Sequence, residues 1–159
     1  MNNYGIQGKN AIVTGASSGI GFAIANSLAL EGVNVLLISR TNDKLEAAAK
    51  VISKSHDVEI KTLLGNVTDK GLPSKAKKIV NDSWGTCDIL INNAGGPPMG
   101  SFISHSEETW LEAYNTNFIS AVRFTKLFVD DMKTNKWGRI LNVSSTIAKE
   151  PTPQMVLSA

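Results

Sequence analysis

The chain has 159 residues, a hydrophobic fraction of 42% and a formal net charge of +2, which predicts one domain spanning 1–159 with a buried core. The lysines are dispersed rather than gathered in a stripe, so we expect neither nucleic acid nor a membrane as a partner. Cys87 is the only cysteine, and no Cys/His cluster has metal-site spacing. We therefore expect no metal, no export and no membrane span, and a cytoplasmic protein.

Short apolar runs alternate along the chain with longer stretches of helical period, which is typical of strand-helix units that build a parallel sheet. The runs are rich in Val, Ile or Leu and are bounded by turn residues. The expected strands are 10–14, 33–39, 58–64, 89–92 and 139–143. We therefore predict an α/β fold.

Helices are expected between these strands. Residues Ile20, Ala23, Ile24 and Leu28 share one face of the first, and Gly32 stands where a left-handed C-terminal cap would end it. The second begins near Asn42 or Asp43, whose side chains can accept bonds from free backbone N–H groups, and runs through 45–52. The third covers roughly 74–84.

The longest helical stretch follows Ser104-His105-Ser106-Glu107, a capping-box pattern. Apolar side chains then recur at helical spacing, and we interpret them as core or as a subunit contact rather than as a cofactor-stacking surface. They are Trp110, Leu111, Tyr114, Phe118, Val122 and Leu127.

A glycine-rich turn directly follows the first strand, in the segment Thr14 to Gly21. Gly15 permits the tight turn, Gly19 lets the backbone approach a diphosphate, and Gly21 allows the helix to pack closely on the sheet. The helix N-terminus then offers free N–H groups to phosphates. No Gly-Lys-Ser/Thr follows, so a nucleoside triphosphate with magnesium is disfavoured.

The end of the second strand carries Ser39 and Arg40, with no carboxylate. A dinucleotide domain uses an acid here for a free ribose 2′-hydroxyl and a basic residue for a 2′-phosphate. A guanidinium pairs with phosphate through two charge-assisted hydrogen bonds. The sequence therefore favours NADP over NAD, which stays possible, unless Arg40 is an ordinary surface arginine.

Four motifs in this order resemble the short-chain dehydrogenase/reductase family over essentially the whole chain. They are the glycine segment Thr14 to Gly21, Asn92-Asn93-Ala94-Gly95 after the fourth strand, Asn117 in a helix, and Gly138 to Ser145 around the fifth strand. The resemblance implies a Rossmann-type doubly wound parallel sheet with strand order 3-2-1-4-5. It also implies that the family's later strands are missing here.

The resemblance further implies which residues line the cofactor. Asn66 and Val67 would border the adenine, with asparagine in place of the more usual aspartate. Small residues after the fourth strand would line the ribose side. The full expected set is Gly15, Ser17, Ser18, Gly19, Ile20, Gly21, Arg40, Asn66, Val67, Asn93, Ala94 and Gly95.

Hydride transfer also requires a group that moves a proton to or from the substrate oxygen. In the family a tyrosine does this, assisted by a lysine four residues later and by a serine. Ser145 is the candidate serine, with Ser144 as its alternative or a merely capping hydroxyl as the other interpretation. Asn117 would hold a water of the proton relay. The tyrosine is expected near position 158, where the chain has Ser158, so the chain is an N-terminal part, a divergent member, or both.

The resemblance thus implies an NADP-dependent oxidoreductase acting on a small carbonyl or alcohol, similar to 3-oxoacyl carrier-protein reductases or sugar dehydrogenases. The partner would be a small-molecule substrate, and the full-length protein would be a homo-oligomer. The alternative is a nucleotide-binding module without turnover.

Overall fold

The computed structural model describes residues 4–158, which form a five-stranded sheet. The strands are β1 Asn10–Thr14, β2 Asn34–Ser39, β3 Ile60–Leu64, β4 Ile89–Asn92 and β5 Arg139–Asn142. Neighbouring strands are parallel throughout, in the order β3-β2-β1-β4-β5. The predicted α/β class and doubly wound strand order are therefore confirmed, and β2, β3 and β5 are slightly shorter than the apolar runs suggested.

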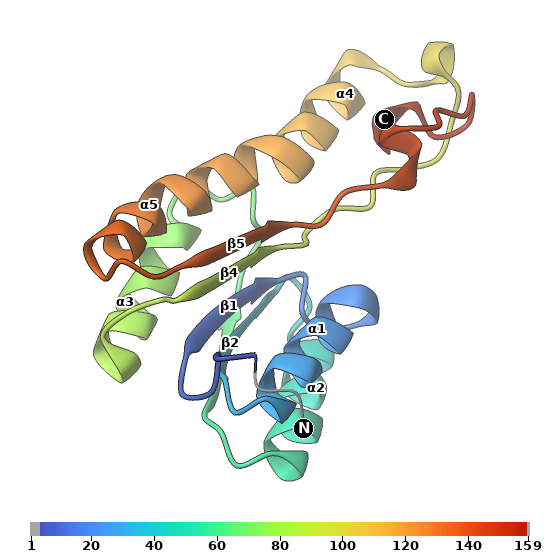
Figure 1. The fold of residues 1–159 in the computed structure, drawn as a ribbon. Helices are drawn as coiled ribbons and strands as arrows, with labels where there is room; N and C mark the ends of the chain where they lie inside the picture. Colours follow the sequence, from blue (N-terminus) through green and yellow to red (C-terminus); the bar gives the residue numbers. More distant parts are fainter. Residues whose placement is uncertain (1–3, 159) are drawn as a thin grey trace.

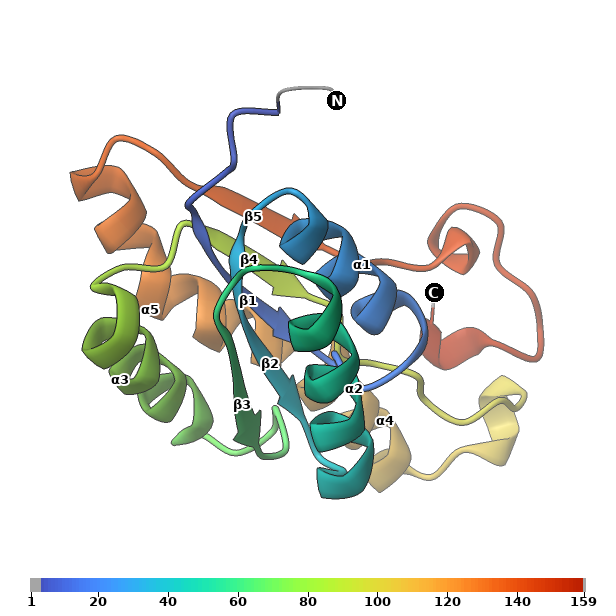
Figure 2. The same ribbon diagram turned by 90° about the horizontal axis from the view of Figure 1, so that it is seen from below.

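Helices cover both faces of the sheet (Figures 1 and 2). They are α1 Gly19–Leu30, α2 Asn42–Ser55, α3 Leu72–Trp84, α4 Glu107–Tyr114 and α5 Ser120–Thr134. Helices α1 and α2 lie on one face, and α3 and α5 lie on the other. A π-helical segment, Asn115–Ile119, joins α4 to α5 in one long rod.

Side chains of the central strand enter both layers, as the alternation of a β-strand requires. Ala11 and Val13 belong to the core beneath α1 and α2, whereas Ile12 belongs to the core beneath α3 and α5. All three side chains are fully buried. This burial on both faces explains why β1 is a continuous apolar run in the sequence.

The buried face of α1 differs from the expected one. The residues that are buried are Gly21, Ala25 and Ala29, while Ile20 is 63% exposed. Ile24 and Leu28 pack only partly against the core. Small side chains at a spacing of four let the helix backbone approach the sheet, so the larger apolar residues lie at the sides of the contact and are only partly buried. The end of α1 is as predicted, because Gly32 has a φ of +75°.

Two helix starts also differ from the prediction. Helix α2 has Thr41 as its N-cap, without a side-chain bond to the first turn, so Asn42 and Asp43 already lie inside the helix. Helix α4 begins after Ser106, whose Oγ accepts a hydrogen bond from Thr109 N at 3.4 Å. Ser104 instead donates to a backbone carbonyl in the preceding short helix, so the predicted box with Glu107 does not form.

The apolar stripe on the α4–α5 rod is mostly not core. Leu111, Tyr114, Phe118 and Val122 are exposed, by 36% to 55%. The side chains that the rod buries are Ala113, Ser120, Phe124, Phe128 and Met132. The core interpretation is therefore wrong for those four residues. The subunit-contact interpretation stays a prediction.

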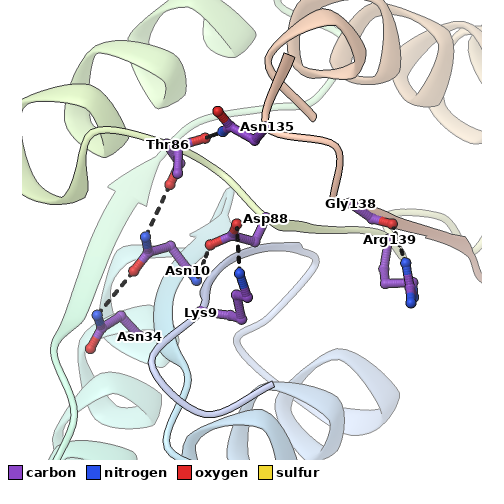
Figure 3. Close-up of polar contacts among 8 residues, drawn as sticks. All are labelled: Lys9, Asn10, Asn34, Thr86, Asp88, Asn135, Gly138 and Arg139. Atoms are coloured by element: carbon purple, nitrogen blue, oxygen red, sulfur yellow. Dashed lines mark hydrogen bonds and ion pairs between the residues drawn. The ribbon is translucent and has the colours of Figure 1, made fainter. Parts of the chain in front are cut away.

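A polar cluster links the amino ends of β1, β2 and β4 (Figure 3). The buried Asp88 accepts a hydrogen bond from Asn10 N at 3.0 Å and lies 3.7 Å from Lys9 Nζ. The Asn10 side chain donates to Thr86 O and accepts from Asn34 Nδ2. These contacts fix the amino edge of the sheet. Among residues 4–158, no helix is both long and apolar enough to cross a membrane.

Candidate functional site

The segment after β1 requires glycine at three positions, Gly15, Gly19 and Gly21. Gly15 has a φ of +64°, and a Cβ there would lie 2.9 Å from Asn93 Nδ2. A Cβ on Gly21 would lie 2.3 Å from Gly15 O, closer than atoms can pack. The first turn of α1 is thus pressed against the glycine turn. Gly19 is the first residue of α1 and has a φ of +56°, so a side chain there would strain the backbone although a Cβ would meet no other atom.

Thr14 joins this turn to the end of β4. Its hydroxyl donates to Ile91 O at 3.2 Å and accepts from the backbone N–H groups of Asn93 and Ala94, at 2.9 and 3.1 Å. Asn93 Nδ2 in turn donates to the carbonyls of Thr14 and Gly15. The amide of Asn93 therefore holds the glycine turn in place. The sequence named Thr14 only as the first residue of the glycine segment and gave its hydroxyl no role.

A cleft of about 420 Å³ opens at the carboxyl ends of β1, β2, β3 and β4. Parallel sheets bind ligands at this edge, where the strand order reverses. Ten of the predicted cofactor residues line it: Gly15, Ser17, Ser18, Ile20, Arg40, Asn66, Val67, Asn93, Ala94 and Gly95. Gly19 and Gly21 do not line it, and Gly21 acts instead through the close packing of α1. The cleft is also lined by residues outside the predicted set, among them Ser39, Thr41, Lys44 and Thr116.

One end of this cleft is cationic. Arg40 and Lys44 both line it, and its lining contains no aspartate or glutamate. Within residues 4–158, neither cation has a carboxylate within ion-pair distance. Two unpaired cations near the end of β2 suit an anionic group. The lining has no carboxylate that could accept a hydrogen bond from a free ribose 2′-hydroxyl.

A second cleft, of about 620 Å³, adjoins the first. The two share Ile20, Asn93, Ala94 and Gly95 in their linings. The second is also lined by the predicted catalytic residues Asn117 and Ser145, together with Ser144 and Ser158. The structure therefore brings these polar side chains, from two distant parts of the chain, to one cavity.

Ser145 and Asn117 also have local partners. Ser145 Oγ accepts from Ile147 N at 3.2 Å and caps the short helix Thr146–Ala148. Asn117 lies in the π-helical segment and donates from Nδ2 to Leu157 O at 3.4 Å. The capping role of Ser145 leaves its hydroxyl proton free to donate, because only its oxygen is used by the cap.

The comparisons with known proteins agree with this arrangement. The family model described as short chain dehydrogenase matches residues 9–157. The chain is 34% identical over 149 residues to the 3-oxoacyl-[acyl-carrier-protein] reductase FabG of Haemophilus influenzae, covering 93% of this chain and 60% of that one.

Solved structures with the same fold hold both kinds of nicotinamide cofactor. The L-sorbose reductase of Gluconobacter frateurii, complexed with NADPH and L-sorbose, superposes with a TM-score of 0.90 at 30% identity, covering 96% of this chain and 59% of that one. A xylitol dehydrogenase bound to NAD⁺ has a TM-score of 0.89 at 27% identity, with 96% and 59% coverage. The chain spans little more than half the length of these relatives. The match to the family model over nearly every residue, on a sheet of the expected order, shows that the chain belongs to the short-chain dehydrogenase family.

Proposed function

We propose that the protein is an oxidoreductase that transfers hydride between a nicotinamide cofactor, NADP in preference to NAD, and a small carbonyl or alcohol. The observation that carries this proposal is the cleft at the carboxyl edge, where the glycine turn, the end of β2 and the turn after β4 converge. The lining of this cleft favours a dinucleotide because Gly15 brings backbone without a Cβ to the cleft, and because Arg40 and Lys44, near the end of β2, have no carboxylate partner within residues 4–158.

The preference for NADP is supported by Arg40. Its side chain is exposed, lines the cleft and has no carboxylate partner among residues 4–158, so a 2′-phosphate would gain a charge-assisted pair without breaking one of these. We expect Arg40→Asp to weaken NADPH at least tenfold and to weaken NADH much less. Fluorescence titration with both cofactors measures this, and equal weakening would refute the role of Arg40.

A bound nicotinamide would supply or accept the hydride, and the protein would position the substrate and move its proton. Ser145 would donate a hydrogen bond to the substrate oxygen, and Asn117 would hold a water between that oxygen and solvent. Ser158 lines the same cleft, but a serine hydroxyl is too weak an acid to replace a tyrosine without an added base. We therefore expect the proton to pass through a water held by Asn117.

Steady-state assays of the full-length protein test the proposal. NADPH oxidation would be followed with a panel of 3-oxoacyl thioesters and ketoses, the substrate types of the similar reductases. We expect turnover with at least one class, and a loss of at least a hundredfold in kcat for Ser145→Ala. Ser144→Ala is the matched control and should retain most activity. Binding of NADPH without turnover of any substrate would instead support a nucleotide-binding module.

We further propose that the full-length protein forms a cytoplasmic homo-oligomer. The exposed side chains Leu111, Tyr114, Phe118 and Val122 support a subunit contact on the α4–α5 rod. Tyr114 and Phe118 stack at a centroid distance of 5.4 Å, so the patch is preformed. The use of a single, buried cysteine is consistent with a reducing compartment. Light scattering of Phe118→Glu should show a smaller assembly than the parent protein.

A further inference from the structure

The turn that follows β3 carries Asn66 and Val67, which both line the first cleft. Asp69 N donates to Asn66 O at 2.9 Å and closes the turn. Val67 is buried in the core beneath α3 and α5, whereas Asn66 is exposed. The turn is thus anchored by an apolar side chain and presents a polar one to the cleft.

One hydrogen bond determines which atom of the Asn66 amide is already used. Thr68 N donates to Asn66 Oδ1 at 3.1 Å. A backbone N–H can only donate, so the atom that faces it is the amide oxygen. The Nδ2 group carries two protons and has no protein acceptor within residues 4–158. Asn66 therefore offers a hydrogen-bond donor to a ligand in the cleft.

Arg123 holds the same turn from α5. Its Nη1 donates to Thr68 O at 3.1 Å, and the two residues lie 55 positions apart in the chain. The Arg123 side chain is half-buried and does not line the cleft, and no carboxylate of residues 4–158 lies within ion-pair distance of it. Thr68 is thus bound at its carbonyl by Arg123 and at its N–H by Asn66. Arg123 can affect a ligand in the cleft only through this turn.

A donor and an acceptor at position 66 would distinguish purine bases differently. Adenine carries an amino group at C6, which donates, next to ring nitrogens that accept. Hypoxanthine, its deaminated form, carries an oxo group at C6, which accepts. A carboxylate bonds the adenine amino group and is repelled by the oxo group. An amide NH₂ group can instead donate to an adenine ring nitrogen or to the hypoxanthine oxo group, so it favours neither base strongly.

We propose that Asn66 recognises the cofactor base through its Nδ2 donor, so that the protein accepts a hypoxanthine dinucleotide nearly as well as the adenine one. Arg123 is the positioning residue that keeps Asn66 in this orientation through Thr68. The proposal rests on the nucleotide-binding function proposed above and extends it to the class of base that the cleft takes.

Titrations of the full-length protein with NADPH and with reduced nicotinamide hypoxanthine dinucleotide phosphate test the recognition of the base. In the parent protein the two Kd values should agree within about threefold, and Asn66→Asp should raise their ratio about tenfold against the hypoxanthine cofactor. The aspartate keeps an acceptor for Thr68 N and replaces only the donor. The ratio also cancels the repulsion between the new carboxylate and the phosphates, which both cofactors share. An unchanged ratio would overturn the role of Asn66.

Arg123→Met tests the positioning role, because it removes the donor to Thr68 O and keeps an apolar stem. The Kd for NADPH should rise about fivefold while kcat at saturating cofactor changes less than about twofold, and Arg123→Lys should restore most of the affinity. Reduced nicotinamide mononucleotide lacks the base, so its KM should be the same in the parent and in Arg123→Met. A KM for the mononucleotide that rises as much as the Kd for NADPH would overturn the role of Arg123.

Lys126→Met is the matched control, because Lys126 is exposed on the same helix and does not line the cleft. Equal losses of NADPH affinity in the two methionine variants would reject Arg123. If Arg123→Met does not fold, Arg123→Gln keeps a polar end that is too short to reach Thr68 O. No loss of NADPH affinity in that variant would also reject Arg123.

The same titrations separate this proposal from the function on which it rests. A parent protein that binds neither cofactor would refute both. A parent protein that binds NADPH but binds the hypoxanthine cofactor far more weakly would leave nucleotide binding intact and overturn the recognition by Asn66.

Discussion

Single residues set the geometry of the cleft, and Gly21 shows this most directly. We expect Gly21→Ala to destabilise the protein by about 1–3 kcal/mol, because the added methyl group overlaps Gly15 O and Asn93 Nδ2. It should also lower the affinity for either cofactor at least tenfold, since relieving the overlap moves the glycine turn. Thermal unfolding and cofactor titration measure the two effects.

Gly71→Ala is the matched control for that change. Gly71 has an ordinary φ of −83°, and a Cβ there would meet only Asp69 Oδ1, at 3.4 Å. The stability of the Gly71→Ala protein should differ from that of the parent by less than about 1 kcal/mol, as expected for an uncrowded site. Comparable losses in the two variants would contradict the packing argument for Gly21.

Cys87 makes the stability of the fold depend on pH. Burial raises the pKa of its thiol from near 9 to about 12, so the folded state keeps the proton that the unfolded chain releases. The stability that this contributes is complete below about pH 9 and is lost as the pH rises through about 12. The slope approaches 1.4 kcal/mol per pH unit in that range.

The comparison with Cys87→Ala isolates this effect from other groups that titrate in the same range. The variant leaves a small cavity and should be less stable at neutral pH. The difference from the parent protein should then shrink in urea titrations from pH 8 to pH 10.5. A difference that stays constant with pH would show that the thiol ionises as readily in the folded protein as in the unfolded chain.

At the scale of elements, the α4–α5 rod separates side chains that support the fold from those that do not. Phe128 is 1% exposed in the core beneath the sheet, whereas Phe118 is 55% exposed. Phe128→Ala should therefore cost about 3–5 kcal/mol in stability. Phe118→Ala makes the same chemical change on the same rod and should cost under about 1 kcal/mol in dilute protein. Chemical denaturation tests both, and similar costs would show that the exposed face is buried in solution.

The sequence was informative about strands and less so about helix faces. Strands β1 and β4 have the predicted bounds because their runs are buried on both sides. The prediction of the buried face of α1 was wrong because Gly21, Ala25 and Ala29 make its contact with the sheet. Such small side chains add little to a hydrophobic pattern in the sequence. The π-helical segment had no signal either, since an extra residue in a helical turn depends on tertiary packing.

At the scale of the molecule, the sequence predicted most of the first cleft because its residues follow strand ends, where parallel topology brings them together. Lys44 was missed because nothing local distinguishes a cleft lysine from a surface lysine on an exposed helix. Ser39 was noted only as a neighbour of Arg40, since its bond to Ser17 joins residues that lie 22 positions apart. Such long-range hydrogen bonds have no counterpart in periodicity or spacing.

The amino edge of the sheet stabilises the fold and the carboxyl edge forms the cleft, so variants at the first should change stability and variants at the second should change cofactor affinity. Asp88→Ala removes the acceptor for Asn10 N and the partner of Lys9 at the amino edge. Leaving that buried N–H unsatisfied should cost about 1–3 kcal/mol in stability. The affinity of the folded protein for NADPH should change less than twofold, because the cleft lies at the carboxyl edge of the same strands.

Arg40→Asp should instead weaken NADPH binding and leave the stability of the fold nearly unchanged, because the exposed side chain of Arg40 supports no core contact. Unfolding and titration of both variants complete the comparison, and a folded Asp88→Ala protein with weak NADPH binding would show that the edges are coupled through β1.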